Sequence, residues 1–112
     1  MKCLLAAALV ISLYAIPKPA AATTIIGIGT SSCGSWVQAR RDRRSFAYEQ
    51  WVIAFISGVA VTLNTELLKD RDPEGAWVWI DNYCNAHPLE MIGAAAGELI
   101  NILRPGTLTR TR

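Results

Sequence analysis

Two cysteines place the strongest constraint on how this chain of 112 residues can fold. Cys33 and Cys84 lie beyond an apolar N-terminal segment that contains the third cysteine, Cys3. Once that segment is removed during export, two cysteines remain in an oxidising compartment, and only one intramolecular pairing exists. The bond would close a loop of about fifty residues, which the chain-entropy model values at about 4 kcal/mol. We therefore predict a Cys33–Cys84 disulfide.

The N-terminal segment has the order of features found in a secretory signal peptide. Lys2 gives a positive start, residues 3–16 are apolar and uncharged, Pro17 breaks the run, and residues 20–22 are small alanines suited to a signal peptidase. The apolar run is shorter than the ~20 residues of a stable transmembrane helix. We expect cleavage near Ala22 and an exported protein without a stable membrane span.

Cleavage changes the charge balance on which a functional argument would rest. Lys2 and Lys18 leave with the signal, so the basic count falls from 11 to nine and equals the nine acidic residues. A net charge near zero gives no general affinity for nucleic acid, and we expect no nucleic-acid partner. The remaining length allows one small domain.

Apolar residues recur every three or four positions in four segments, and no segment alternates as a strand does. Ser31 or Ser32 can cap the first predicted helix, Ser45 the second, and Asp72 followed by Pro73 the third. The fold class predicted is all-α, a small four-helix single domain with one disulfide. The predicted helices span residues 33–41, 45–68, 73–86 and 88–103, with an extended lead-in over 23–32, a helical domain over 33–104 and a flexible tail over 105–112.

The second predicted helix has no charged residue between Glu49 and Glu66 and is apolar nearly all round. Such a helix is the central element of a bundle or lies against a partner, so Trp51 and Phe55 become candidate partner-binding residues. Gly58, in the helix interior, is expected to mark close packing of another helix.

The third predicted helix carries two tryptophans that cannot share one face. Trp77 and Trp79 are two positions apart and diverge by about 200° on a helix. We expect one of them, or Tyr83, to be exposed. An exposed Trp79–Tyr83 pair would form a protein-binding patch, and the alternative is a larger core covered by a second copy in a homodimer.

Four arginines form a charged connector after the first helix: Arg40, Arg41, Arg43 and Arg44. The cluster is short, is interrupted by Asp42 and lacks the interleaved aromatic residues typical of nucleic-acid binding. It is interpreted as a solvated connector or as a contact to a partner protein.

Metal and catalytic sites have little support in the sequence. The acids between Asp70 and Asp81 have the spacing of a calcium-binding loop, but Pro73 and the short side chain of Asp81 depart from that pattern, and calcium stays open. His87 is the sole histidine and is expected to cap a helix junction, a pH switch being the alternative. Ser57 has no neighbouring base. We expect no enzymatic activity, no cofactor and no bound metal.

Three features together resemble the HdeA/HdeB group of small periplasmic helical proteins. These are Cys33 at the head of a short helix, a long helix with the sequence WVIAFISG at residues 51–58, and the sequence YCNAHP at residues 83–88 that opens the last helix. The resemblance implies a periplasmic location, one disulfide, and an acid-stress chaperone: a dimer at neutral pH that loosens in acid and binds unfolded client proteins.

The chain also resembles the periplasmic immunity proteins that neutralise type VI amidase effectors. The shared features are the segment Ile-Ser-Gly-Val at residues 56–59 and the His-Pro step before the final helix. This resemblance implies a dedicated effector protein as the partner. A dimeric structural module is the third interpretation, and all three predict a protein that acts by binding protein.

Overall fold

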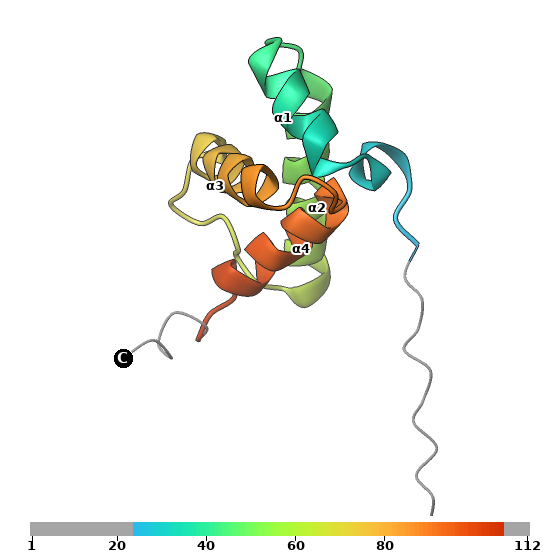
Figure 1. The fold of residues 1–112 in the computed structure, drawn as a ribbon. Coiled ribbons are helices and arrows are strands. Elements are labelled where there is room, and N and C mark those ends of the chain that lie inside the picture. The colour runs from blue at the N-terminus through green and yellow to red at the C-terminus, as the bar shows by residue number, and fades with distance from the viewer. Residues whose placement is uncertain (1–23, 107–112) are drawn as a thin grey trace, which may run out of the picture.

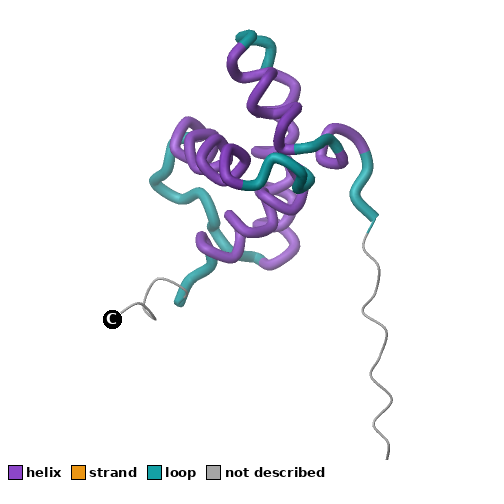
Figure 2. Tube along the Cα trace, in the orientation of Figure 1, coloured by secondary structure: helices purple, strands orange, loops and turns teal. Residues whose placement is uncertain are grey.

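The computed structural model describes residues 24–106, and the signal peptide predicted for residues 1–22 lies outside them. A short 3-10 helix, η1 (Gly27–Thr30), precedes four α-helices: α1 (Cys33–Arg41), α2 (Phe46–Leu63), α3 (Pro73–Ala86) and α4 (Ile92–Leu103) (Figure 1). No strand occurs over residues 24–106, and loops alone join the helices (Figure 2). The all-α, single-domain prediction is confirmed.

Local sequence accounts for two of the helix starts. The Ser32 hydroxyl accepts a hydrogen bond from the backbone N–H of Ser35 at 3.2 Å, and the Asp72 carboxylate accepts from the N–H of Gly75 at 2.9 Å. Both contacts satisfy N–H groups that a helix leaves unpaired in its first turn. The predicted bounds of α1 and α3 are confirmed.

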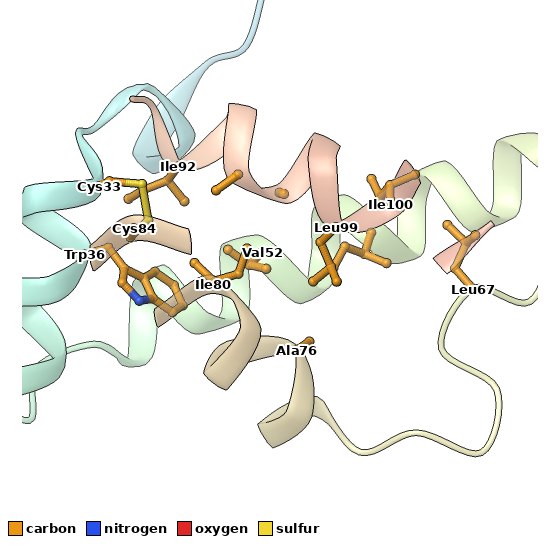
Figure 3. Close-up of a cluster of buried hydrophobic side chains, with 13 residues drawn as sticks. Cys33, Trp36, Val52, Leu67, Ala76, Ile80, Cys84, Ile92, Leu99 and Ile100 are labelled. Carbon is orange, nitrogen blue, oxygen red and sulfur yellow. A yellow bond between two sulfur atoms is a disulfide. The ribbon is translucent and has the colours of Figure 1, made fainter. Parts of the chain in front are cut away.

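Helix α2 ends five residues before the predicted end. Asn64 has a left-handed backbone, with φ of 48°, and its N–H donates to the carbonyl of Val61, so the chain leaves the helix there. Leu67 is buried beyond the helix end, near Ile100 of α4 (Figure 3). Ser45 stands at the predicted cap position, but its hydroxyl donates to the Glu49 carboxylate and accepts no hydrogen bond from the helix backbone.

Helix α4 begins at Ile92, four residues later than predicted. The turn that precedes α4 is hydrogen-bonded to α1. The N–H of Cys33 donates to the carbonyl of Glu90 at 2.7 Å, and the N–H of Gly34 donates to the carbonyl of Pro88 at 3.0 Å. The N–H of Ile92 in return donates to the carbonyl of Ser31 at 2.9 Å. Because these carbonyls accept hydrogen bonds from the first turn of α1, residues 88–90 do not form the first turn of α4.

The lead-in predicted as extended is extended only over residues 24–26, since Gly27–Thr30 forms η1. Gly29 is buried, and a Cβ there would overlap the ring of Trp51. A Cβ at Gly93 would lie 2.6 Å from Cδ1 of Ile25 and 3.1 Å from the carbonyl oxygen of Gly29. The two glycines let the lead-in pack tightly between α2 and α4.

The core lies where α1, α2 and α4 meet around α3 (Figure 3). Trp36 is its largest fully buried side chain, and Ile80 at the middle of α3 is also fully buried. The core contains Cys33, Trp36, Val52, Ile56, Leu67, Ala76, Ile80, Cys84, Ile92, Ala95, Ala96, Leu99 and Ile100.

Candidate protein-binding surfaces

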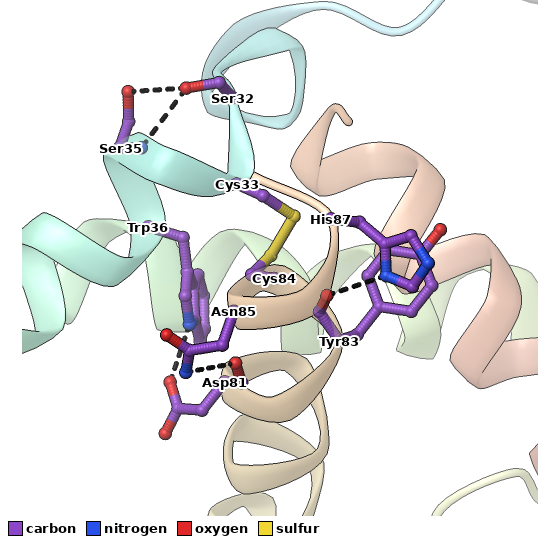
Figure 4. Close-up of a disulfide and its surroundings, with 9 residues drawn as sticks. All are labelled: Ser32, Cys33, Ser35, Trp36, Asp81, Tyr83, Cys84, Asn85 and His87. Atoms are coloured by element: carbon purple, nitrogen blue, oxygen red, sulfur yellow. Dashed lines mark hydrogen bonds between the residues drawn. A yellow bond between two sulfur atoms is a disulfide. The ribbon is translucent and has the colours of Figure 1, made fainter. Parts of the chain in front are cut away.

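The disulfide predicted from the cysteine count is present. Cys33 and Cys84 are bonded across a sequence separation of 51, with Cα atoms 4.6 Å apart, and both residues are fully buried (Figure 4). The bond joins the first residue of α1 to the last turns of α3. It therefore fixes α1 and α3 as one unit.

The sequence predicted that Arg40 lies in a solvated connector or contacts a partner protein. In the structure, Arg40 belongs to an ion cluster between helices. Its Nε donates to Oδ1 of Asp81 at 2.9 Å and its Nη2 to Oδ2 at 2.8 Å, while Nη1 donates to Oε1 of Glu49 at 2.7 Å. The carboxylate of Asp81 also accepts from the indole of Trp36 at 2.7 Å (Figure 4). Arg40 thus ties α1 to both α2 and α3.

The electrostatics of Arg40 follow from these contacts. The hydrogen bonds to Asp81 raise the pKa of the Arg40 guanidinium, and Glu49 raises it further against the opposing effect of burial. The guanidinium also lies 5.9 Å from the ring centre of Trp36 and 3.7 Å from Glu74. Sequence spacing places Arg40 one helical turn from Trp36, but it does not indicate the contacts with Asp81 and Glu49.

The other three arginines of the connector remain at the surface. Arg41, Arg43 and Arg44 are exposed, and none forms an ion pair with a residue of the described segment. Asp42, between them, accepts hydrogen bonds from the side chain of Gln38 at 3.1 Å. These three side chains stay candidates for contact with an anionic partner.

A ladder of stacked rings runs along α3, here called the aromatic ladder: Trp79, Tyr83 and His87. The ring centres are 5.4 Å apart between Trp79 and Tyr83, and 4.3 Å apart between Tyr83 and His87. Burial, together with the charges of Glu90 and Glu98, raises the pKa of Tyr83.

His87 closes α3, as predicted. Its backbone N–H and its ring Nδ1 each donate to the carbonyl of Tyr83 at 2.9 Å (Figure 4). The expectation that Trp77, Trp79 or Tyr83 would be exposed is wrong, because all three are half-buried. Trp77 donates from its indole to the carbonyl of Glu49 at 3.2 Å, so α2 covers one side of α3 while Trp79 lies on the other.

Helix α2 leaves a broad apolar surface uncovered. Of its eighteen residues only Val52 and Ile56 are buried, and Val61 is 82% exposed. A Cβ at Gly58 would meet nothing within 4 Å, so the predicted packing of another helix against it is wrong. We define the open face of α2 as Gln50, Ala54, Ser57, Gly58 and Val61, all of them exposed.

The rings of Trp51 and Phe55 border this open face. They stack with centres 5.1 Å apart and are half-buried. Shallow grooves run beside them: one is shared with Ile25 and Ile26 of the lead-in, and one continues past Val59 and Leu63. Length and composition would also allow α2 to cross a membrane, a test that apolar helices of other proteins pass as well.

The acids of the predicted calcium-loop spacing do not form a loop. Asp72 caps α3, and Asp81 lies more than two turns along that helix, with both oxygens bonded to Arg40. Within residues 24–106, no three His, Cys, Asp or Glu residues lie close enough together to hold a metal ion. Ser57 is exposed on α2.

No family model, curated protein or solved structure matches this chain.

Proposed function

We propose that the chain is an exported, non-enzymatic domain that binds other proteins, and that it acts as an acid-stress chaperone in the periplasm. The observation that carries this proposal is the open face of α2. It is apolar or small in every position but Gln50, carries no charge, and has no covering element among the described residues. An uncovered apolar surface of this kind is typical of a protein-binding site.

The chemistry of the open face suits unfolded clients. An unfolded chain presents apolar side chains in no fixed order, so a site for it gains from apolar contact and loses from charges that would need partners. Ala54, Ser57 and Gly58 are small and let a client segment approach the helix closely. The rings of Trp51 and Phe55 offer larger contact area at the border.

Acid can enlarge this site through the Arg40 cluster. Because the pKa of Arg40 is raised, its guanidinium stays charged, and it faces the carboxylates of Asp81, Glu49 and Glu74. The net charge of the chain after residue 22 rises from about zero to about +10 when its acids and His87 are protonated. Loss of the cluster would loosen α1 from α2, while the disulfide keeps α1 attached to α3.

The test is light scattering of an acid-sensitive client at about pH 2 to 3, with and without the oxidised protein. The decisive variant is Val61→Lys, which puts a charge at the most C-terminal residue of the open face, where the side chain is 82% exposed. Its matched control is Val78→Lys, which adds the same charge at an exposed valine of α3 that is 46% exposed. We expect the wild type and Val78→Lys to suppress aggregation and Val61→Lys to lose several-fold in potency. No suppression by the wild type would contradict the chaperone proposal.

The aromatic ladder favours a second candidate function, neutralisation of one secreted effector. Trp79, Tyr83 and His87 are already stacked on the disulfide-anchored helix α3, and a preformed aromatic surface suits a single dedicated partner. This candidate predicts tight binding at neutral pH that Tyr83→Ala weakens at least tenfold and Val61→Lys leaves unchanged. Affinity for purified periplasmic effectors, measured by calorimetry, separates the two functions.

A further inference from the structure

The connector between α1 and α2 carries a cluster of cations that neither proposed function uses. In Figure 1 this connector lies at an extremity of the fold, where α1 ends and α2 begins. Arg41, Arg43 and Arg44 are exposed there, and within residues 24–106 none of them forms an ion pair. Residues 41–48 contain these three cations and one acid, Asp42, so their net charge is +2. The connector is therefore a projecting, positively charged surface.

A large apolar side chain stands beside these cations. Phe46, the first residue of α2, is 73% exposed and does not belong to the core or to the side chains packed against it. The nearest acid on α2, Glu49, is half-buried and bound to Arg40 and Ser45, so its charge is offset within the fold. We define the arginine tip as Arg41, Arg43, Arg44 and Phe46.

The backbone holds Arg43 in a conformation that favours glycine. Arg43 has φ of 55°, and the N–H of Arg44 donates to the carbonyl of Ala39 at 2.9 Å, which closes the end of α1. This left-handed position just after a helix is the usual place of a glycine, because any Cβ there is crowded by the backbone. The arginine at residue 43 therefore costs stability. A charge that costs stability and pairs with no described residue points to a partner outside the domain.

We propose that the arginine tip docks on the surface of a membrane that contains anionic phospholipids. Guanidinium groups form paired hydrogen bonds to phosphate oxygens, and the negative surface potential of such a membrane attracts cations that project toward it. The ring of Phe46 enters the boundary between headgroups and acyl chains, where aromatic side chains are favoured. A dissolved phosphate ion would bind the arginines and leave Phe46 in water, so the combination favours a lipid surface.

The shape of the arginine tip favours a membrane over an acidic protein. A projecting end can meet a broad flat surface without a matching cavity in the partner (Figure 1). The open face of α2 begins one turn after Phe46, at Gln50, and contains no acid that an anionic membrane would repel. Docking of this kind holds the domain at a membrane through a few side chains, and it is independent of client binding by the open face.

The test is sedimentation of the oxidised protein with lipid vesicles at neutral pH. One set of vesicles contains phosphatidylglycerol and phosphatidylcholine in equal amounts, and the other contains phosphatidylcholine alone. The protein begins at residue 23, because the apolar residues 3–16 of the predicted signal peptide would themselves bind lipid. Circular dichroism verifies that each variant keeps the helical content of the wild type.

Three variants probe the arginine tip. The first combines Arg43→Gln with Arg44→Gln, and its matched control combines Arg71→Gln with Arg104→Gln, which removes the same charge at two exposed arginines elsewhere. The second is Arg43→Gly, which removes one cation at a backbone position that suits glycine, so a loss of binding could not come from a weakened fold. The third is Phe46→Ser, which removes the exposed ring.

We expect the wild type to sediment with the anionic vesicles and not with the neutral ones, and binding should weaken as the salt concentration rises. One arginine near an anionic surface strengthens binding about fivefold, so Arg43→Gly should weaken it about fivefold and the double tip variant about twentyfold. Phe46→Ser should weaken binding several-fold. The control at Arg71 and Arg104 should stay within about twofold of the wild type.

Several results would overturn the proposal. Equal losses in the double tip variant and in its control would assign the binding to net charge and not to the arginine tip. Equal binding to neutral vesicles would assign it to apolar contact elsewhere. Displacement from the vesicles by phosphate, but not by chloride at equal ionic strength, would identify a dissolved phosphate ion as the ligand. A wild type that binds polyglutamate and does not sediment with anionic vesicles would assign the tip to an acidic protein.

Discussion

Helices α2 and α3 are both rich in apolar residues, but they are held in the fold in different ways. Helix α3 buries Ala76, Ile80 and Cys84, and it is tied to its neighbours by the disulfide and by Asp81. Helix α2 is longer and more apolar, but it buries only Val52 and Ile56. Specific covalent and polar links, and not total hydrophobicity, decide which helix is fixed in place here. The less anchored helix retains apolar surface for another use.

The polar contacts of α2 are gathered at one end. Glu49 accepts from Arg40 and Ser45, and its backbone carbonyl accepts from Trp77. From Gln50 to the end of the helix, side-chain hydrogen bonds to neighbouring helices are absent from the described contacts. The first turn of α2 is therefore anchored, and the remainder is held by apolar packing on one side.

Among the changes that test this difference between α2 and α3, loss of the disulfide should have the largest effect on the free energy of unfolding. Reduction, or the Cys33→Ser variant, should lower the free energy of unfolding by about 4 kcal/mol, because the bond closes a loop with a sequence separation of 51. Urea denaturation with and without reductant measures the change. A small shift of the midpoint would show that α3 does not depend on its covalent link.

Removal of the Asp81 carboxylate should have the next largest effect. Asp81→Leu leaves the Trp36 indole without an acceptor and Arg40 with one fewer counter-charge, so a loss of about 2 to 3 kcal/mol is expected at neutral pH. Asp42→Asn, at an exposed carboxylate that contacts only Gln38, is the control and should be close to neutral.

The Asp81 effect should depend on pH in a defined direction. The raised pKa of Arg40 means that its stabilising contribution is present at every pH below the ordinary arginine value and is lost only in extreme alkali. The stability difference between Asp81→Leu and wild type should therefore stay constant as the pH rises from neutral toward the ordinary arginine value, as urea denaturation at several pH values would measure. A difference that declines well below that value would show that the charge of Arg40 is not its source.

Two glycine substitutions should change stability in opposite directions. Gly58→Ala on the open face of α2 should stabilise the protein by up to about 1 kcal/mol, because alanine favours a helix and nothing obstructs its Cβ. Gly93→Ala on α4 should destabilise it by about 1 to 3 kcal/mol, because the new methyl meets Ile25 and the backbone of Gly29. Thermal unfolding of both variants measures the pair, and equal signs would contradict the packing described here.

The smallest expected effect on stability is that of Val61→Lys. At a side chain that is 82% exposed, the free energy of unfolding should change by no more than about 0.5 kcal/mol. The same variant is expected to lose client binding, so unfolding and light scattering together separate binding from folding. A large loss of stability would mean that α2 is covered in the free protein.

The sequence was sufficient where a local signal determines local structure. Ser32, Asp72 and Pro73 predicted two helix starts, and the cysteine count predicted the disulfide. The sequence was insufficient where contacts between residues far apart in the chain determine the structure. The turn before α4 exists because its carbonyls bond to α1, and the role of Arg40 requires Asp81 to lie beside it.

Of the two arrangements predicted for α2, a central position in the bundle is wrong, because only Val52 and Ile56 are buried, and the cause is general. A helix that is apolar all round predicts neighbours on every side, yet a domain this small has too few elements to supply them. The sequence identified Trp51, Phe55, Trp79 and Tyr83 as surface candidates, and all four are half-buried at the borders of open surface. The exposed residues Gly58 and Val61 of the open face are ordinary residue types that could not have marked it in the sequence.

The hydrogen bonds between the start of α1 and the turn at residues 88–90 also constrain the order of events during biogenesis. The first N–H groups of α1 find their acceptors only when the carbonyls of Pro88 and Glu90 are in place. Because a chain is synthesised with its N-terminus first, the first turn of α1 cannot form all of its hydrogen bonds until residues 88–90 have also been synthesised. The N-terminal helix is completed late, at about the time that Cys84 becomes available to Cys33.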